Sequence, residues 1–301
     1  MGGAGGTAAA EMAGSSGGGG AAAAFASLAA LCGGGGSRAC RGGVEATAGL
    51  RGADRMEDRH VMLVRGGVAL AAVFDGHGGD GAAAFCADNL ALELAAQAAQ
   101  AGVDGGARAA ALGEALSRSF VRLNERLLAE VPSEDAGCTA LAALVLPDTT
   151  LIANAGDCVA HLWRGGAAGA ADSLERVSRD HNAAVPEEAA RVAAAGGSVQ
   201  TTADGKARVG GVIQVTRCIG DRRLRHLGLS SEPELRCCAR APTDVGIVLA
   251  SDGLWDVMDE ARVLHCLTHT ARSADMLAKR LVLEAMDRGT TDNVTCAVVL
   301  F

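Results

Sequence analysis

The sequence predicts an α+β domain in which helices are layered on antiparallel sheets. Apolar, β-branched runs of strand length recur from about Ala46 to Phe301, and several follow one another after short turns. Short turns between neighbouring strands favour hairpins and antiparallel pairing. The helical patterns come in blocks between groups of strands, which favours layered helices over a βαβ alternation.

The expected elements are recognised by residue type, length and periodicity. Strands are predicted at His60–Val64, Val68–Phe74, Thr139–Leu146, Leu151–Ala155, Val159–Trp163, Gly246–Ala250 and Val294–Phe301. Helices are predicted at Gly81–Gln100, Arg108–Val131, Pro186–Ala195, Asp259–Thr270 and Ala274–Arg288. The start at Pro186 is well marked, because proline suits the first helical position and acidic Glu187 and Glu188 follow in the first turn.

The N-terminal segment differs from the rest in composition. Residues 1–45 are rich in Gly, Ala and Ser, so we expect a low-complexity, disordered segment before one domain at 46–301. The apolar run Ala21–Cys32 is too short to span a bilayer, and no basic region precedes it, so no membrane span or signal peptide is predicted. An organellar transit peptide stays open, although arginine occurs in this segment only at 38 and 41.

Charge and cysteine content exclude two classes of protein. A formal net charge of −8 over 301 residues argues against a nucleic-acid-binding protein, which normally carries a basic field. The ten cysteines include no C-x-x-C pair, and the chain is long for a fold stapled by disulfides. We therefore expect buried free thiols in a reducing compartment, the cytoplasm or the nucleus.

Acidic residues gather at the ends of the predicted strands. The residues in these positions are Glu57, Asp58, Asp75, Asp157, Asp252 and Asp292. At any single position a turn-forming role explains an Asp equally well. Several carboxylates that meet at one sheet edge repel one another unless cations neutralise them. Oxygen ligands without Cys or a His pair suit Mg²⁺ or Mn²⁺, and two such ions form the clamp used for attack on phosphorus.

Gly76, Gly78 and Gly81 spell G-x-G-x-x-G after an apolar run, which is the spacing of a dinucleotide-binding turn. Asp75 and His77 interrupt it, however, where a pyrophosphate would have to lie. The predicted layering also lacks the βαβ alternation that such a turn requires. A nucleotide-dependent oxidoreductase is therefore the less favoured interpretation.

Nine short segments follow one another in a specific order. They are RMEDRH (55–60), VFDGHGG (73–79), GCTA (137–140), NAGD (154–157), RDH (179–181), AAAGGSV (193–199), TRCIGD (216–221), SDGLWDV (251–257) and TDNVT (291–295). In this order the chain resembles the metal-dependent, type 2C family of protein serine/threonine phosphatases, from about Ala46 to the C-terminus. The resemblance implies a four-layer α/β/β/α sandwich of two antiparallel sheets flanked by helices. It also implies a monomeric catalytic domain that dephosphorylates phosphoprotein substrates in signal transduction.

The resemblance further implies a site for two divalent ions, Mg²⁺ or Mn²⁺, and a weaker third. By motif position, the ligands of the first two ions are Glu57, Asp75, the Gly76 carbonyl, Asp252 and Asp292, with Asp75 bridging both. Asp157 and Asp256 match positions associated with the third ion, and Asp58 would act through ordered water. The implied reaction is direct attack on phosphorus by the water that bridges the two main ions, without a phosphoenzyme.

His77 matches the general acid of the family. A serine or threonine alkoxide is a poor leaving group that needs a proton, and histidine titrates near neutrality. The family usually places a phosphate-binding arginine three residues before the methionine of M-E-D, where this chain has Ala53. Arg51 and Arg55 flank that position, and either is expected to reach the phosphate, because arginine grips two oxygens at once. The alternative is that both are surface arginines.

Two functions remain open at this stage. The first is an active Mg²⁺- or Mn²⁺-dependent phosphatase, favoured because the five main metal positions and His77 are all present. The second is a catalytically weak pseudophosphatase that acts as a binding or regulatory module, an alternative that follows from Ala53.

Overall fold

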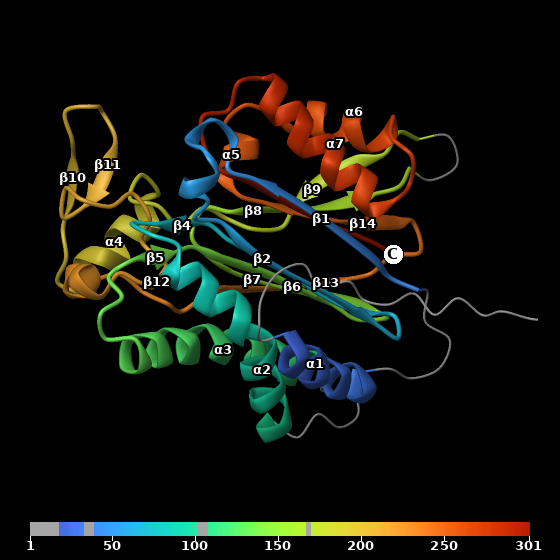
Figure 1. The fold of residues 1–301 in the computed structure, drawn as a ribbon, viewed down its shortest axis with the longest axis horizontal. Helices are drawn as coiled ribbons and strands as arrows, with labels where there is room; N and C mark the ends of the chain where they lie inside the picture. The colour runs from blue at the N-terminus through green and yellow to red at the C-terminus, as the bar shows by residue number, and fades with distance from the viewer. Residues whose placement is uncertain (1–17, 33–38, 102–107, 167–169) are drawn as a thin grey trace, which may run out of the picture.

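A computed structural model describes residues 18–32, 39–101, 108–166 and 170–301. Two five-stranded antiparallel sheets stack face to face, and helices cover the outer face of each (Figure 1). The predicted four-layer α/β/β/α sandwich is therefore confirmed.

The first sheet has the order β1-β15-β14-β8-β9. Its strands are β1 (Arg41–Thr47), β15 (Val294–Leu300), β14 (Asp244–Ala250), β8 (Val159–Arg164) and β9 (Ser173–Arg176). The second sheet has the order β13-β7-β6-β3-β2. Its strands are β13 (Glu234–Ala239), β7 (Thr149–Ala155), β6 (Ala140–Val145), β3 (Val68–Phe74) and β2 (Arg59–Arg65). The central strands of both sheets match runs that the sequence predicted as strands.

Strand periodicity separates the core between the two sheets from the cores beneath the helical layers. Along β3, Val68, Leu70, Ala72 and Phe74 face the helices, whereas Ala69, Ala71 and Val73 face the other sheet. Successive strand side chains point to opposite faces, so a strand between two layers is apolar at every position. The core between the sheets is rich in alanine, as expected for a chain with only 2% aromatic residues.

The helices fall into two groups. The second sheet is covered by α1 (Gly18–Cys32), α2 (Gly81–Ala101) and α3 (Arg108–Glu130), which lie below it in Figure 1. The first sheet is covered by α5 (Asp252–Trp255), α6 (Glu260–Thr268) and α7 (Ala274–Asp287), above it in the same view. In α3 the buried residues Leu112, Leu116, Phe120, Leu123 and Leu127 recur every three or four positions, which is the spacing of one helix face.

Smaller elements extend the sandwich at one end. A three-stranded sheet has the order β12-β5-β4. Its strands are β12 (Ile219–Gly220), β5 (Gly137–Cys138) and β4 (Gly76–His77). Beside it lie α4 (Pro186–Ala194), the hairpin β10 (Val199–Thr201) and β11 (Ala207–Val209), and three 3₁₀ turns, η1 (Gly49–Arg51), η2 (Ala53–Arg55) and η4 (Arg222–Leu227). These elements surround the acidic edge described below.

The structure differs from the sequence prediction at the N-terminus. Residues 18–32 form α1, and its Phe25 and Leu28 are buried in the core beneath the second sheet, so the expected disorder is wrong for this stretch. β1 begins at Arg41, ahead of the predicted domain start, and pairs with β15 over its whole length. Residues 1–17 and 33–38 lie outside the described part of the chain, and the division at residue 45 otherwise stays a prediction.

Two further expectations concern the whole chain. All ten cysteines are free, and nine are buried, as predicted, with Cys237 exposed. Among the described residues, no helix is both long enough and apolar enough to cross a membrane.

Candidate metal and phosphate site

The predicted acidic residues come from separate elements and meet at one edge of the sandwich. Asp75 follows β3 and Asp157 follows β7, both in the second sheet. Asp252 begins α5 directly after β14, and Asp292 precedes β15, both in the first sheet. The negative charges of Asp252, Asp157 and Asp292 all act on Asp75. Both sheets therefore contribute carboxylates to one neighbourhood.

Asp75 lies at the centre of this electrostatic cluster. Burial raises the pKa of its carboxyl well above the ordinary value, and the surrounding carboxylates raise it further. Burial and neighbouring carboxylates likewise raise the pKa of Asp252 to about 7, although a hydrogen bond with Asp75 opposes this. The pKa of Asp157 rises to about 6, again chiefly through burial. Burial also raises the pKa of Asp256, and the charge of Asp292 adds to it. Negative charge is thus costly here unless a cation balances it.

The two oxygens of the Asp58 carboxylate differ in their partners. Its Oδ2 accepts hydrogen bonds from Ser251 Oγ at 2.9 Å and Thr295 Oγ1 at 2.7 Å. Its Oδ1 is buried and has no hydrogen-bond partner among the described residues. Burial raises the pKa of Asp58 to about 6, against the effect of both hydroxyl groups. An orphaned carboxylate oxygen within a set of repelling oxygen donors fits a hard divalent cation.

The carboxylates do not form a closed cluster. In the described ranges, no three His, Cys, Asp or Glu side chains are grouped so that they could hold one metal ion. A positive side chain lies among them: Arg51 Nη2 contacts Asp292 Oδ2 at 2.7 Å, and Nη1 lies 3.6 Å from Glu57 Oε2. The structure therefore brings the predicted ligands near one another, with a guanidinium balancing two of them.

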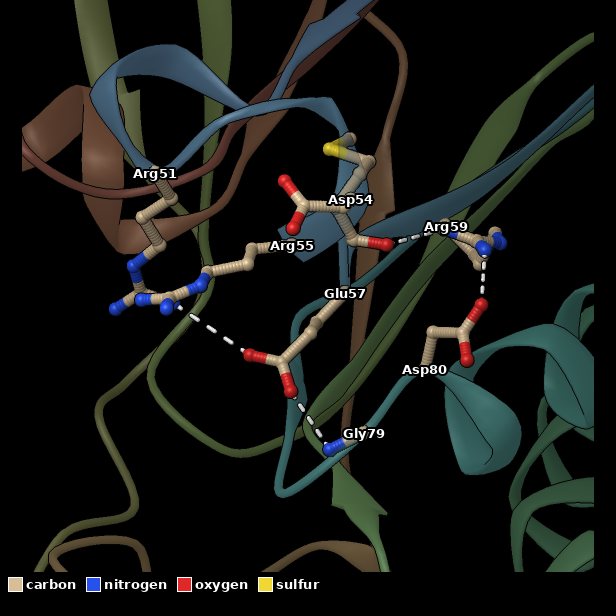
Figure 2. Close-up of a pocket in the computed structure, with 8 residues that line it drawn as sticks. Arg51, Asp54, Arg55, Glu57, Arg59, Gly79 and Asp80 are labelled. Atoms are coloured by element: carbon tan, nitrogen blue, oxygen red, sulfur yellow. Dashed lines mark hydrogen bonds and ion pairs between the residues drawn. The ribbon is translucent and has the colours of Figure 1, made fainter.

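A cleft opens beside these residues. It has a volume of about 670 Å³ and is lined by Arg51, Asp54, Arg55, Met56, Glu57, Arg59, Gly79 and Asp80 (Figure 2). Arg59 is paired with Asp80 and donates to the Met56 carbonyl oxygen at 2.8 Å. The side chain of Arg55 is exposed and, in the described part of the chain, makes no hydrogen bond or ion pair, while its backbone N–H donates to the Gly52 carbonyl oxygen at 2.9 Å. The cleft thus presents Arg51 next to the acidic edge and a second guanidinium without a partner.

Glu57 is held on both sides. Its backbone N–H donates to Asn293 Oδ1 at 2.9 Å. Its Oε1 accepts from the Gly79 N–H at 2.6 Å, and Figure 2 shows this second bond. A side chain at Gly76 would overlap the backbone oxygen of Glu57. Glycine at 76 therefore permits the close approach of the Glu57 segment to β4.

His77 contacts a carboxylate that the sequence analysis did not assign. Its Nε2 lies 2.8 Å from Asp221 Oδ2. Burial by itself would lower the pKa of His77, but the hydrogen bond and charge of Asp221 outweigh it, and the charges of Asp157 and Glu57 add to this, so the pKa is raised. The imidazole therefore has the environment of a proton donor.

Several residues that organise the site were missed in the sequence. They are Asp221, which contacts His77, Ser251 and Thr295, which bind Asp58, and Asn293, which binds Glu57. Each stands inside one of the nine motifs, so position offered a signal. The contacts themselves join residues more than 140 positions apart, and no local pattern predicts such a pairing.

Comparison with known proteins agrees with this arrangement. A profile described as protein phosphatase 2C matches residues 43–294. The chain belongs to the protein phosphatase 2C family. It is 34% identical over 272 residues to a "Protein kinase and PP2C-like domain-containing protein" of Arabidopsis thaliana, covering 84% of this chain but 38% of that protein. It is 37% identical over 234 residues to "Probable protein phosphatase 2C 59" of the same species, covering 78% of this chain and 70% of the relative.

Among solved structures, the serine-threonine phosphatase 2C from Toxoplasma gondii aligns with a TM-score of 0.75 at 21% identity. The alignment covers 88% of this chain and 96% of that one. At this identity the likeness supports the fold alone. The chain spans about two fifths of the length of the Arabidopsis protein that is named for both a protein kinase and a PP2C-like domain.

Proposed function

We propose that this chain is a metal-dependent protein serine/threonine phosphatase that hydrolyses phosphoserine and phosphothreonine by direct attack of water. The observation that carries the proposal is the meeting of carboxylates from both sheets around Asp75, next to His77 and Arg51. Membership of the protein phosphatase 2C family supports the same class of reaction.

The proposed ligands of two divalent ions are Glu57, Asp75, the Gly76 carbonyl, Asp252 and Asp292, with Asp157 and Asp256 for a weaker third and Asp58 acting through water. Mg²⁺ and Mn²⁺ both suit these oxygen donors. When bound, such ions lower the pKa of a coordinated water and balance the charge of the phosphate. Ser251 donates a hydrogen bond to Asp58, and the Glu57 backbone N–H donates to Asn293. These two bonds hold the two acidic residues in place.

His77 is proposed to donate the proton that the leaving group needs. As the bond between phosphorus and the serine or threonine oxygen breaks, its electron pair stays on that oxygen, which takes the proton from the ring nitrogen. The raised pKa of His77 keeps the ring protonated closer to neutrality.

Arg51 is proposed to bind the phosphate in place of the arginine that the family usually has at position 53. It already lies against Asp292 and Glu57, so its guanidinium is beside the oxygens that the substrate would approach. Two parallel N–H groups can grip two phosphate oxygens, which a single ammonium cannot do.

The test is phosphate release from a phosphothreonine peptide by the purified chain with Mn²⁺, with Mg²⁺ and with chelator. We expect release with either metal and none with chelator. Folded protein without metal-dependent release would instead favour the pseudophosphatase, the alternative that Ala53 suggests. Binding of the same peptide without turnover would then identify a binding module.

A further inference from the structure

We propose that Asp221 is a positioning residue that fixes the orientation of the His77 imidazole during proton transfer. This inference rests on the proposed function, in which His77 is the proton donor. The bond of His77 Nε2 to Asp221 Oδ2, at 2.8 Å, is the only hydrogen bond of this ring within the described residues. With Nε2 occupied by the carboxylate, Nδ1 is the ring nitrogen left to face the leaving oxygen.

The register of the small sheet brings the two residues together. β5 lies between β12 and β4, with Gly137 opposite Gly220 on one side and opposite His77 on the other. Gly220 and His77 therefore lie level with each other on the two sides of β5. Asp221 directly follows Gly220 in the chain, so its side chain begins one residue further along. Residues 144 positions apart are therefore placed by three paired strands rather than by a flexible loop.

Asp221 adopts a strained backbone conformation. Its φ of 51° lies in the left-handed region, and it is the one non-glycine residue with positive φ among those described. Such conformations persist where the surroundings enforce them, and they concentrate at functional sites. The exposed fraction of its side chain is 5%, against 35% for His77, so a buried carboxylate supports a partly exposed ring.

The backbone around Asp221 is anchored from three directions. The Asp221 N–H donates to the Ala136 carbonyl oxygen at 3.1 Å. Arg225 donates to the carbonyl oxygens of Gly220 and Cys218 at 2.9 and 2.8 Å. Asn124, on α3, accepts from the Gly220 N–H at 3.1 Å and also binds Arg225. These bonds hold the carboxylate in place without involving any proposed metal ligand.

The space between the two side chains admits no other group. A Cβ atom at Gly137 would overlap the Asp221 carboxylate and the His77 ring nitrogen. Glycine is therefore required on β5 for the contact to form. If Asp221 had only a structural role in its own turn, glycine would not be needed at 137 to leave room for its contact with His77.

The test compares two substrates that differ in their need for a proton. A phosphothreonine peptide releases an alkoxide, whereas p-nitrophenyl phosphate releases a stable phenolate. Rates with saturating Mn²⁺ are measured for wild type, Asp221→Ala, Asp221→Asn, His77→Ala and the double variant His77→Ala with Asp221→Ala. Asp135→Ala is the matched control, since this nearby carboxylate pairs with Arg223 and, among the described residues, with no proposed site residue.

If the inference holds, Asp221→Ala lowers kcat on the peptide by about 100-fold or more, the usual range for a lost general acid. The loss on p-nitrophenyl phosphate is at least about tenfold smaller. The double variant is no slower than His77→Ala, because the two residues act as a unit. Asp221→Asn falls between wild type and Asp221→Ala, because an amide oxygen can still accept from Nε2. This variant also decides the matter if the alanine protein does not fold.

Equal losses on both substrates, or losses that multiply in the double variant, would overturn the positioning role while the phosphatase stands. A wild-type protein that hydrolyses neither substrate with Mn²⁺ or Mg²⁺ would overturn the proposed function and this inference with it. The control variant must keep both wild-type rates.

Discussion

Arg51 is the residue that most alters the expected site. Ala53 stands where the family usually has its phosphate-binding arginine, so the sequence left Arg51 and Arg55 as equal candidates. In the structure Arg51 contacts Asp292 and Glu57, whereas the Arg55 side chain has no hydrogen-bond or ion-pair partner in the described ranges. Both guanidinium groups line the cleft, and the one at the end of η1 lies against the proposed metal ligands.

Replacing Arg51 should weaken substrate binding more than it slows chemistry. We expect Arg51→Ala to raise KM for a phosphothreonine peptide about tenfold or more, the usual effect of losing a charged hydrogen bond. Arg51→Lys should restore only part of the loss, since lysine cannot grip two oxygens. Arg65→Ala, on the exposed end of β2, is the control and should keep the wild-type KM. An unchanged KM in Arg51→Ala would assign the phosphate to another residue.

Single residues could be predicted from the sequence only where a motif carried them. The proposed acidic ligands, His77 and Gly76 stood in motifs, and the structure places several of the acids near Asp75. Asp221 stood in the motif TRCIGD without a role, because its partner is far away in the sequence. Long-range contacts of this kind depend on strand register, and the short strands β4, β5 and β12 have no periodicity to detect.

At the scale of elements, Glu188 joins α4 to the segment that leads into β12. It accepts hydrogen bonds from Arg217 Nη2 at 2.6 Å, Thr216 Oγ1 at 2.7 Å and Arg191 Nε at 3.0 Å. Burial by itself would raise the pKa of Glu188, but these donors outweigh it and lower the pKa to about 2. A buried carboxylate with three donors is costly to leave unpaired, so this cluster fixes α4 in place.

This cluster predicts a pH dependence of stability with a definite sign. Because the pKa of Glu188 is lower in the folded state, its contribution is complete above its ordinary value of 4.5 and is lost as pH falls through about 2. Glu188→Gln should lower the free energy of unfolding by about 2 to 3 kcal/mol at pH 7. It should also flatten the decline between those pH values, as measured by denaturant titration.

Glu187→Gln is the control, since Glu187 is exposed on the same turn. Equal stability of the two variants at pH 7, or an unchanged slope in Glu188→Gln, would contradict the role given to the cluster.

Strands with a strong apolar pattern could be predicted from the sequence, and strands without one could not. The buried strands β3 and β6 read as strands because every position is apolar, and in β15 every position except Thr295 is apolar. β13 was missed because ELRCCA is short and mixes charged and small residues, and β1 was missed because RGGVEAT shows no alternation. Both are edge strands, so their partners rather than their own residues define them.

At the scale of the whole molecule, α1 adds to the layer of helices beneath the second sheet. Its composition of Gly and Ala suggested a disordered segment, yet Phe25, Leu28 and Cys32 are buried against that layer. Alanine and leucine favour a helix, and burial of one face against this layer adds to that local propensity. The N-terminal segment is therefore partly integral to the fold.

Two leucines on α1 test this directly. Leu28 is 1% exposed and Leu31 is 51% exposed. Leu28→Ala should lower the free energy of unfolding by about 2 to 4 kcal/mol, the usual cost of a buried cavity, and Leu31→Ala by less than about 1 kcal/mol. Denaturant unfolding measures both. Equal effects would mean that α1 does not pack as described.

The sandwich could be predicted as a whole because nine ordered motifs and the strand pattern agreed. The acidic edge followed from that fold, since strands of both sheets end there. For the guanidinium beside it the sequence offered two candidates, Arg51 and Arg55, and no local pattern chose between them.

The measurement that tests the central claim most directly is the rate of phosphate release from a phosphothreonine peptide by wild type and Asp75→Asn at saturating Mn²⁺. Unfolding curves confirm that both proteins are folded. We predict metal-dependent release by wild type and none detectable by Asp75→Asn, because Asp75 would hold the metal ions that lower the pKa of the attacking water. Comparable rates for the two folded proteins would contradict that role and the mechanism built on it.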